Sequence, residues 1–471
     1  MQIGTSRISG PSQGETPVSS PSDTNPWRDS LIGLEDRGRL RELLTVSGKP
    51  IVGLGQADEY QVAHLVGTGI RSIRMPTDEG IEIARDLILR IKTHYWTRYR
   101  SKRDYLAGVY DIEGTDAQGD YKPVCLSGHA GVGKSTLMLD LTRILQQPSL
   151  IDVGAGHDKV KLIRCWRVSL GKGMTVGRVL AKLIDGERLT AKRMRTDEII
   201  ELCRRIAYRD GVGLIVVDEL QFLAQSADAK TAISSLLLEL GKLGIPFVFV
   251  ANHSACQKLE SLPEEVRDRL LSAPRILLPS LRGTDYWIGY LGEIQRVLGR
   301  TLAGNLADEQ SEIFSLTAGL MRHVEQLFVG TYADVWAQGR RCVTMRDLMN
   351  FYDSTSNTHY RKRVEQSIAE FANDNKMPKH DRSPFPPPTV TAQVYANLEK
   401  EKRAKLYAEE VLRQSLTVKE REALAAKEKR QQPRPPLKPK TVTKAARPRK
   451  LTAAEHHAEY LAKGGRGIYP Q

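Results

Sequence analysis

The sequence lacks the features of an exported or membrane-spanning protein. No apolar run reaches the length needed to cross a bilayer. The first residues, MQIGTSRISGPSQGETPVSS, have neither the basic start nor the apolar core of a secretory signal. The five cysteines are a scattered set without a C-x-x-C pair. These absences argue against a disulfide framework, a zinc site and a membrane partner, and they favour a reducing cytoplasm.

The charge is concentrated near the C-terminus. The chain of 471 residues has a formal net charge of +14. Residues 376–471 hold 13 Lys and 9 Arg against 10 Asp and Glu, so this region carries nearly all of the excess. A basic segment of this kind is typical of an arm that binds nucleic acid or an acidic partner. The alternative is a disordered segment that keeps the protein in solution.

Apolar strands that alternate with helical stretches predict the fold class. Continuous apolar strands between helices are typical of a parallel sheet with helices on both faces, which makes the chain an α/β protein with a five-stranded sheet. We expect the strands at residues 123–127, 159–170, 213–218, 245–251 and 275–281.

Composition divides the chain into five regions. We expect a disordered N-terminus (1–24), an N-terminal extension (25–122), the α/β core (123–282), a small helical lid (283–355), and a largely disordered basic tail with a charged helical stretch (356–471). Because the tail is charged and rich in proline, residues after about 384 are expected to bury little.

The segment GHAGVGKS at residues 128–135 matches G-x-x-x-x-G-K-[ST] and lies between a strand and a helix, as that motif requires. Its glycines let backbone N–H groups surround phosphate oxygens, and the helix N-terminus adds its positive dipole end. Lys134 is expected to reach the β- and γ-phosphates, and Ser135 to bind Mg²⁺. The predicted nucleotide contacts are Gly128, His129, Ala130, Gly131, Val132, Gly133, Lys134, Ser135 and Thr136.

An acidic pair follows the buried strand in LIVVDELQFL. Asp218 ends the strand, where a carboxylate holds Mg²⁺ in this class of NTPase. Glu219 comes next, and a second acid at this point can orient and deprotonate the attacking water. The pair therefore favours hydrolysis by water over phosphoryl transfer to a small molecule. The alternative is a strand that ends in a solvated acidic turn.

Further polar residues lie where a nucleotide site would need them. Asn252 follows the strand 245–251, at the edge that faces the ligand crevice, and is expected to position the water. Its alternative role is that of a plain turn residue. Arg322 opens a helix of the lid and is expected to contact the γ-phosphate, the alternative being a surface arginine. One arginine before the last strand is expected to reach the nucleotide of a neighbouring subunit. Ordinary ion pairs are the alternative there, and we favour Arg269 among Arg267, Arg269 and Arg275.

These motifs, in this order, resemble those of the AAA+ superfamily. Within it, residues 25–355 resemble the TnsC/TniB type of transposition regulator. The likeness is local and lies in IRMPTDEG (73–80), LIVVDELQFL, IPFVFVAN and TAGLMRHVEQLFVGTYADVWAQG. Two departures are evident: Asn252 stands where some members have Thr, and the basic tail exceeds that of the minimal members.

The resemblance implies an ATP-dependent, DNA-binding homo-oligomer, a ring or helical filament on duplex DNA, in the bacterial cytoplasm. It would link a TniQ/TnsD-type target selector to a TnsA/TnsB-type transposase. ATP with Mg²⁺ would permit assembly, hydrolysis would remove it, and Met75 and Pro76 would border the adenine. Basic residues of two loops would neutralise DNA phosphates, and the alternative is that they are ordinary solvated surface charges. These residues are Lys172, Lys192, Arg193 and Arg195.

Two other functions stay open. One is a helicase loader or another AAA+ DNA remodeller. The other is a DNA-binding scaffold with negligible ATP turnover, against which Glu219 argues. A phosphotransferase is a more distant third, because no second substrate site is visible in the sequence.

Overall fold

The computed structural model describes residues 25–111, 121–154, 156–184, 194–225, 229–372, 384–417 and 419–420. The chain divides into two compact units, Met1–Ala404 and Lys405–Gln471, and the sheet described below lies in the first. The described part of the second unit is chiefly the end of one exposed helix. Within the described ranges, no helix combines the length and the apolar character needed to span a bilayer.

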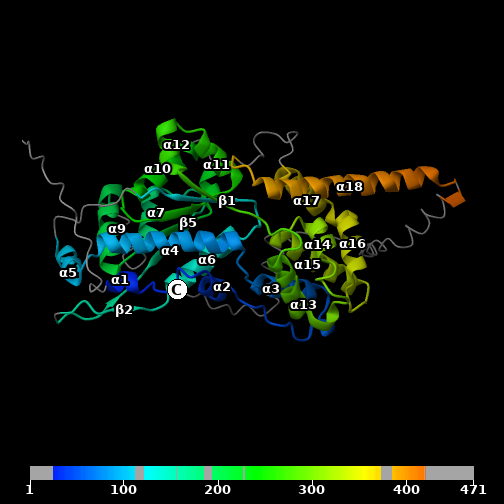
Figure 1. The fold of residues 1–471 in the computed structure, drawn as a ribbon, viewed down its shortest axis with the longest axis horizontal. Coiled ribbons are helices and arrows are strands. Elements are labelled where there is room, and N and C mark those ends of the chain that lie inside the picture. The colour runs from blue at the N-terminus through cyan, green and yellow to red at the C-terminus, as the bar shows by residue number, and fades with distance from the viewer. Residues whose placement is uncertain are drawn as a thin grey trace, which may run out of the picture. The chain divides into compact units, whose positions relative to one another are not determined.

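A parallel sheet of five strands, counted over the described residues, forms the centre of the first unit (Figure 1). The strand order is β4-β5-β6-β1-β7, and each neighbouring pair is parallel, which confirms the predicted sheet. The single strand predicted over 159–170 is instead two, because β3 pairs with β2 and β4 pairs with β5. The bounds are β1 Val124–Gly128, β2 Leu150–Ile151, β3 Val160–Lys161, β4 Cys165–Ser169, β5 Leu214–Asp218, β6 Phe247–Val250 and β7 Ala273–Leu277.

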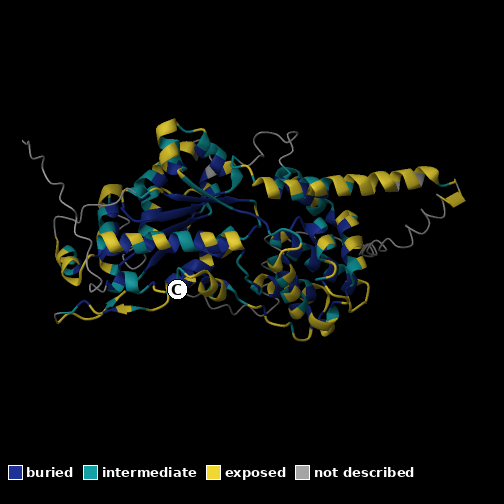
Figure 2. Ribbon diagram, viewed as in Figure 1, coloured by how far each residue is buried: buried dark blue, intermediate teal, exposed yellow. Residues whose placement is uncertain are grey.

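Successive side chains of a strand enter two different cores, because side chains alternate across a strand. Leu214 and Val216 of β5 share one core with α4 and α6, whereas Ile215 and Val217 share the other with α7, α9, α10 and α11. Helices therefore cover both faces, and the strands between them are buried (Figure 2). This explains why the inner strands β5 and β6 are almost wholly apolar. The helices here are α4 Asp78–Arg98, α6 Lys134–Leu145, α7 Val176–Leu183, α9 Thr196–Asp210, η3 Leu220–Gln225, α10 Ala229–Gly241, α11 His253–Glu260 and α12 Glu264–Leu270.

The segment before the sheet packs against two parts of the first unit. Near the end of α4, Trp27 stacks on Tyr99 with ring centroids 5.1 Å apart and packs against Tyr105. By contrast, α3 packs against α15, among the helices that follow the sheet (Figure 1). The N-terminal extension thus supports both the α/β core and the helical region. Its elements, besides α4, are α1 Pro26–Asp29, α2 Arg37–Leu44, η1 Leu54–Gln56, α3 Glu59–Ser72 and α5 Lys102–Tyr110.

The helical region continues beyond the boundary predicted at residue 355. Ile368 and Phe371 of α17 are buried, as are Tyr395 and Leu398 near the start of α18. The Tyr395 hydroxyl donates to the Ala318 carbonyl at 2.8 Å. The expectation that residues after about 384 bury little is therefore wrong for the first turns of α18. The region comprises α13 Asp285–Leu298, η4 Gly299–Thr301, α14 Gln310–Thr317, α15 Met321–Ala337, α16 Met345–Asp353, η5 Thr355–Asn357, α17 Thr358–Phe371 and α18 Thr389–Ser415.

Candidate functional site

The glycine-rich loop joins β1 to α6 in a conformation that needs its glycines. Gly128, Gly131 and Gly133 have φ values of 146°, 89° and 101°, in the left-handed region that side chains disfavour. A Cβ atom on Gly128 would lie 2.4 Å from the Leu277 carbonyl oxygen, and one on Gly131 would lie 2.7 Å from the Cβ of Arg322. The loop is thus packed so closely that a side chain at Gly128 or Gly131 would clash with its neighbours.

Lys134, the first residue of α6, points back into the loop. Its Nζ donates to the carbonyl oxygens of Gly128 at 2.6 Å and His129 at 3.0 Å. The pKa of Lys134 is lowered to about 8, chiefly by burial and in part by the charge of Arg322. Backbone carbonyls therefore hold the ammonium group in the place where a phosphate oxygen would make the stronger, charge-assisted hydrogen bond.

Ser135 and Asp218 lie together at the carboxyl edge of the sheet. The Ser135 hydroxyl donates to Oδ1 of Asp218 at 2.9 Å, and the Asp218 carboxylate is almost fully buried. A hydroxyl and a carboxylate side by side are oxygen ligands of the kind that Mg²⁺ prefers. The two residues proposed from the sequence as the metal site are therefore compatible in position and in chemistry with that ion.

Arg167 on β4 completes this cluster, and the sequence analysis did not identify it. Its Nη2 donates to Oδ2 of Asp218 at 2.8 Å. Its buried Nε makes no hydrogen bond with any residue that the structure describes. The signal in the sequence is a cation inside an otherwise apolar strand, CWRVS. A charge at such a position needs a partner, because burying an unpaired ion is costly.

Glu219 has a strained backbone. Its φ is +64°, an unusual value for a residue with a side chain, and its N–H donates to Oδ1 of Asp218 at 2.9 Å. The Gln221 side-chain amide donates to the Glu219 carboxylate. Strain of this kind is concentrated at functional sites, where the surrounding structure holds it. Gln221 was not singled out from the sequence, although it lies two residues after the proposed base.

Asn252 lies at the edge of the sheet where it was expected, but its side chain also begins a helix. Its Oδ1 accepts from the Ala255 N–H at 2.9 Å and from the Ser254 hydroxyl at 3.0 Å, which makes it the N-cap of α11. Its assignment as a water-positioning residue remains a prediction. Arg322 is exposed on the first turn of α15 and packs against Gly131 of the loop, and its role at the phosphates remains a prediction.

The three arginines proposed for a neighbouring subunit differ in their surroundings. Arg275 forms an ion pair with Asp86 at 3.1 Å, and Arg267 pairs with Asp268 at 3.2 Å. Arg269 is exposed near the C-terminus of α12. The choice of Arg269 stays a prediction.

A cavity beside the loop is lined by the segment proposed to border the base. Its volume is about 50 Å³, and its lining includes Met75, Pro76, Val132 and Met321. The Tyr286 hydroxyl donates to the Met75 carbonyl at 3.1 Å and thereby fixes this segment. An apolar cavity next to a phosphate-binding loop is where the base of a nucleotide would fit.

The proposed DNA-contacting residues lie partly outside the description. Lys172 is exposed in the turn after β4, and Arg195 is exposed at the start of α9, where its backbone N–H donates to Glu198 at 2.9 Å. Lys192 and Arg193 lie outside the described residues. DNA contact by these four residues remains a prediction.

Comparisons with known proteins found one matching sequence family and several similar solved structures. Residues 118–259 match the sequence family described as the AAA domain. The chain is similar to the ORC2 protein of Aeropyrum pernix, with 12% identity over 64% of this chain and 93% of that chain, and a TM-score of 0.36. It is also similar to Cdc6p of Pyrobaculum aerophilum (14% identity, 66% and 84%, TM-score 0.36). A third similar structure is domain III of the replication initiation protein DnaA of Thermotoga maritima (14%, 53% and 88%, TM-score 0.32). No curated protein sequence matches the chain significantly.

The fold and the site together define the class. A parallel five-stranded sheet, counted over the described residues, with a glycine loop after β1 and an acidic pair after β5, is the AAA+ P-loop NTPase fold. The AAA-domain match covers the part of the chain that carries this loop and this pair. The predicted fold class is confirmed. The narrower TnsC/TniB assignment remains a prediction.

Proposed function

We propose that this protein binds ATP with Mg²⁺ and hydrolyses it. The observation that carries this proposal is the convergence of Lys134, Ser135, Asp218 and Glu219 at one edge of the sheet, beneath a glycine loop whose conformation excludes larger residues.

Each side chain has a role that follows from its position. Lys134 exchanges two backbone carbonyls for phosphate oxygens. Ser135 and Asp218 would hold Mg²⁺, which supplies positive charge to the phosphates when it is bound. Arg167 must then share or release the Asp218 carboxylate. The Glu219 carboxylate accepts a proton from the attacking water after its hydrogen bond with the Gln221 amide has opened.

We further propose that ATP controls assembly of this protein on duplex DNA, as in the TnsC/TniB type of transposition regulator. The resemblance of the sequence motifs and the basic residues of the segment 376–471 support this hypothesis. In this proposal the oligomer connects a TniQ/TnsD-type target selector with a TnsA/TnsB-type transposase in the bacterial cytoplasm. ATP binding permits assembly, and hydrolysis ends it.

A second candidate is a DNA-binding scaffold with slow ATP turnover. It is favoured by two contacts within the site: the Arg167 guanidinium donates to Asp218, and the Gln221 amide donates to Glu219. Both contacts must open before hydrolysis, so the basal rate would be low.

One experiment separates these functions. ATP hydrolysis and DNA retention are measured with duplex DNA, with single-stranded DNA and without DNA. The regulator requires ATP-dependent binding to duplex DNA and release as ATP is consumed. Duplex binding without turnover would indicate the scaffold. A preference for single-stranded DNA, together with binding to a replicative helicase, would indicate a loader. Absence of ATP binding would contradict all three.

A further inference from the structure

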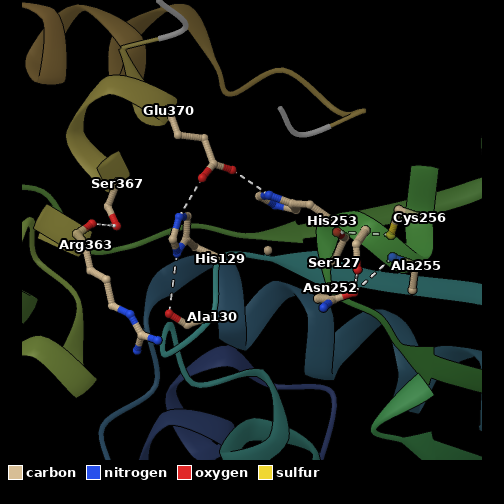
Figure 3. Close-up of polar contacts among 12 residues, drawn as sticks. Ser127, His129, Ala130, Asn252, His253, Ala255, Cys256, Arg363, Ser367 and Glu370 are labelled. Carbon is tan, nitrogen blue, oxygen red and sulfur yellow. Dashed lines mark hydrogen bonds and ion pairs between the residues drawn. The ribbon is translucent and has the colours of Figure 1, made fainter. Parts of the chain in front are cut away.

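One carboxylate joins the helical region to the nucleotide site. Oε2 of Glu370 lies 2.6 Å from Nε2 of His129, and Oε1 lies 2.5 Å from Nδ1 of His253 (Figure 3). The three side chains are 12%, 18% and 15% exposed, in the order Glu370, His129 and His253. The proposed catalytic machinery uses none of these three side chains.

The two histidines belong to different parts of the site. His129 is the second residue of the phosphate loop, and its carbonyl oxygen accepts from Nζ of Lys134 at 3.0 Å. His253 directly follows Asn252 and begins α11. Each imidazole therefore belongs to a residue whose backbone lies at the site, next to Lys134 in one case and to Asn252 in the other.

Glu370 is presented by α17, which packs against neighbouring helices of the same region. Val364, Ile368 and Phe371 of α17 are buried in the core shared with α14 and α16. The Phe371 ring also lies 5.1 Å from the His129 ring, measured between centroids. The carboxylate is therefore held by its own helix and cannot follow the histidines freely.

The electrostatics indicate that the contact is a strong one. Burial by itself would raise the pKa of Glu370, but the hydrogen bonds and charges of His129 and His253 bring it down to about 2. The carboxylate therefore stays ionised at neutral pH. Separating the buried carboxylate from its two imidazole partners is unfavourable, because it would leave a buried polar group without a partner.

We propose that Glu370 is a positioning residue for the nucleotide site, which it reaches through His129 and His253, so that docking of α17 and occupancy of the site are coupled. The proposal rests on the nucleotide-binding part of the proposed function. Coupling of this kind is reciprocal: if docked α17 favours nucleotide, bound nucleotide must favour docked α17 by the same factor.

The first test compares two glutamates of the same helix. Glu370→Gln keeps the side-chain size and removes the charge, and Glu365→Gln changes an exposed residue of α17 as the matched control. ATP affinity is measured by calorimetry with Mg²⁺ and without DNA, and amide exchange of α17 is followed with and without ATP. We expect Glu370→Gln to weaken ATP binding about tenfold and to abolish ATP-dependent protection of α17. Glu365→Gln should behave as the wild type.

A double-mutant cycle distinguishes positioning from general stability. If Glu370 acts through the loop histidine, the affinity losses of His129→Gln and Glu370→Gln should be clearly less than additive in the double variant. Additive losses would overturn the proposal, and so would wild-type affinity in Glu370→Gln. Should Glu370→Gln fail to fold, His129→Gln and His253→Gln must each remove ATP-dependent protection of α17, and retained protection would overturn the coupling. If the wild type itself binds no ATP, the proposed function fails as well.

Discussion

The phosphate loop and the Glu370 bridge meet at His129, yet they are built in different ways. The loop is one continuous stretch of eight residues, and its geometry follows from three glycines and the helix that begins at Lys134. The bridge joins residues 129, 253 and 370, which come from three elements. A local site therefore depends on a long-range contact for the position of one of its own residues. Five predictions test the local site and the long-range contacts around it.

The largest effect is expected from Lys134→Ala. The substitution removes the ammonium group that meets the β- and γ-phosphates, and ATP binding should disappear in calorimetry. Lys242→Ala is the control, because that lysine pairs with Glu239 on the surface. Wild-type affinity in Lys134→Ala would refute the phosphate-loop assignment.

Glu219→Gln should separate binding from chemistry. The variant keeps the size of the side chain but loses its basicity, so ATP should bind normally while hydrolysis falls about 10²–10⁴-fold. If hydrolysis drives release, the variant should remain on duplex DNA, which filter-binding decay at fixed salt would report. Normal turnover would remove Glu219 from catalysis, and fast release without turnover would contradict the switch.

Two truncations compare the start of α18 with the residues beyond it. Ending the chain at residue 384 removes the buried Tyr395 and Leu398, and the helical region should lose about 3–5 kcal/mol of stability. Ending it at Ala404 keeps both residues, so thermal unfolding should stay close to that of the full chain. The longer form should still lose salt-sensitive DNA affinity, because most of the Lys and Arg residues of the segment 376–471 lie after residue 404. Equal stability of the two forms would show that α18 does not support the core.

Arg167→Met should destabilise the ligand-free protein. It leaves the buried Asp218 carboxylate without its cation, and because Arg167 is itself 27% exposed we expect a loss of about 1–3 kcal/mol. Mg²⁺ with ATP should restore much of the melting temperature, since it supplies the missing charge. Arg178→Met, on the exposed surface of α7, serves as the control. A loss that persists with Mg²⁺ and ATP would indicate a packing role instead.

The smallest effect concerns pH. Burial lowers the pKa of Lys134 to about 8 in the ligand-free protein, and phosphate favours the protonated form. About nine-tenths of the lysine is protonated at pH 7 and about one-tenth at pH 9, so ATP affinity should fall about tenfold between them. Binding near pH 8 should take up about half a proton, which calorimetry in buffers of different ionisation enthalpy measures. Constant ATP affinity between pH 7 and pH 9 would show that the pKa of Lys134 lies outside this range.

The sequence was most informative where chemistry is local. The apolar strands, the loop GHAGVGKS and the pair Asp218–Glu219 are contiguous patterns, and chain geometry forces each of them into a small number of conformations. The fold class and the sites of Lys134, Ser135 and Asp218 were therefore predictable. The parallel direction of the strands also follows, because helical crossovers connect them.

Other parts were decided by long-range packing. Arg167 and Asp218 lie on neighbouring strands but 51 residues apart, and Glu370 lies 241 residues from His129. No local pattern specifies such pairs, because they depend on which elements the hydrophobic cores bring together.

The extent of the helical region was set in the same way. The first turns of α18 look like a charged, solvated helix, and burial of Tyr395 and Leu398 depends on the core that receives them. The sequence by itself thus determined the sheet, the loop and the acidic pair, since these need neighbouring residues alone. The tertiary structure decided the cation beside Asp218 and the carboxylate that holds the loop histidine, because each depends on contacts that form when the whole domain packs.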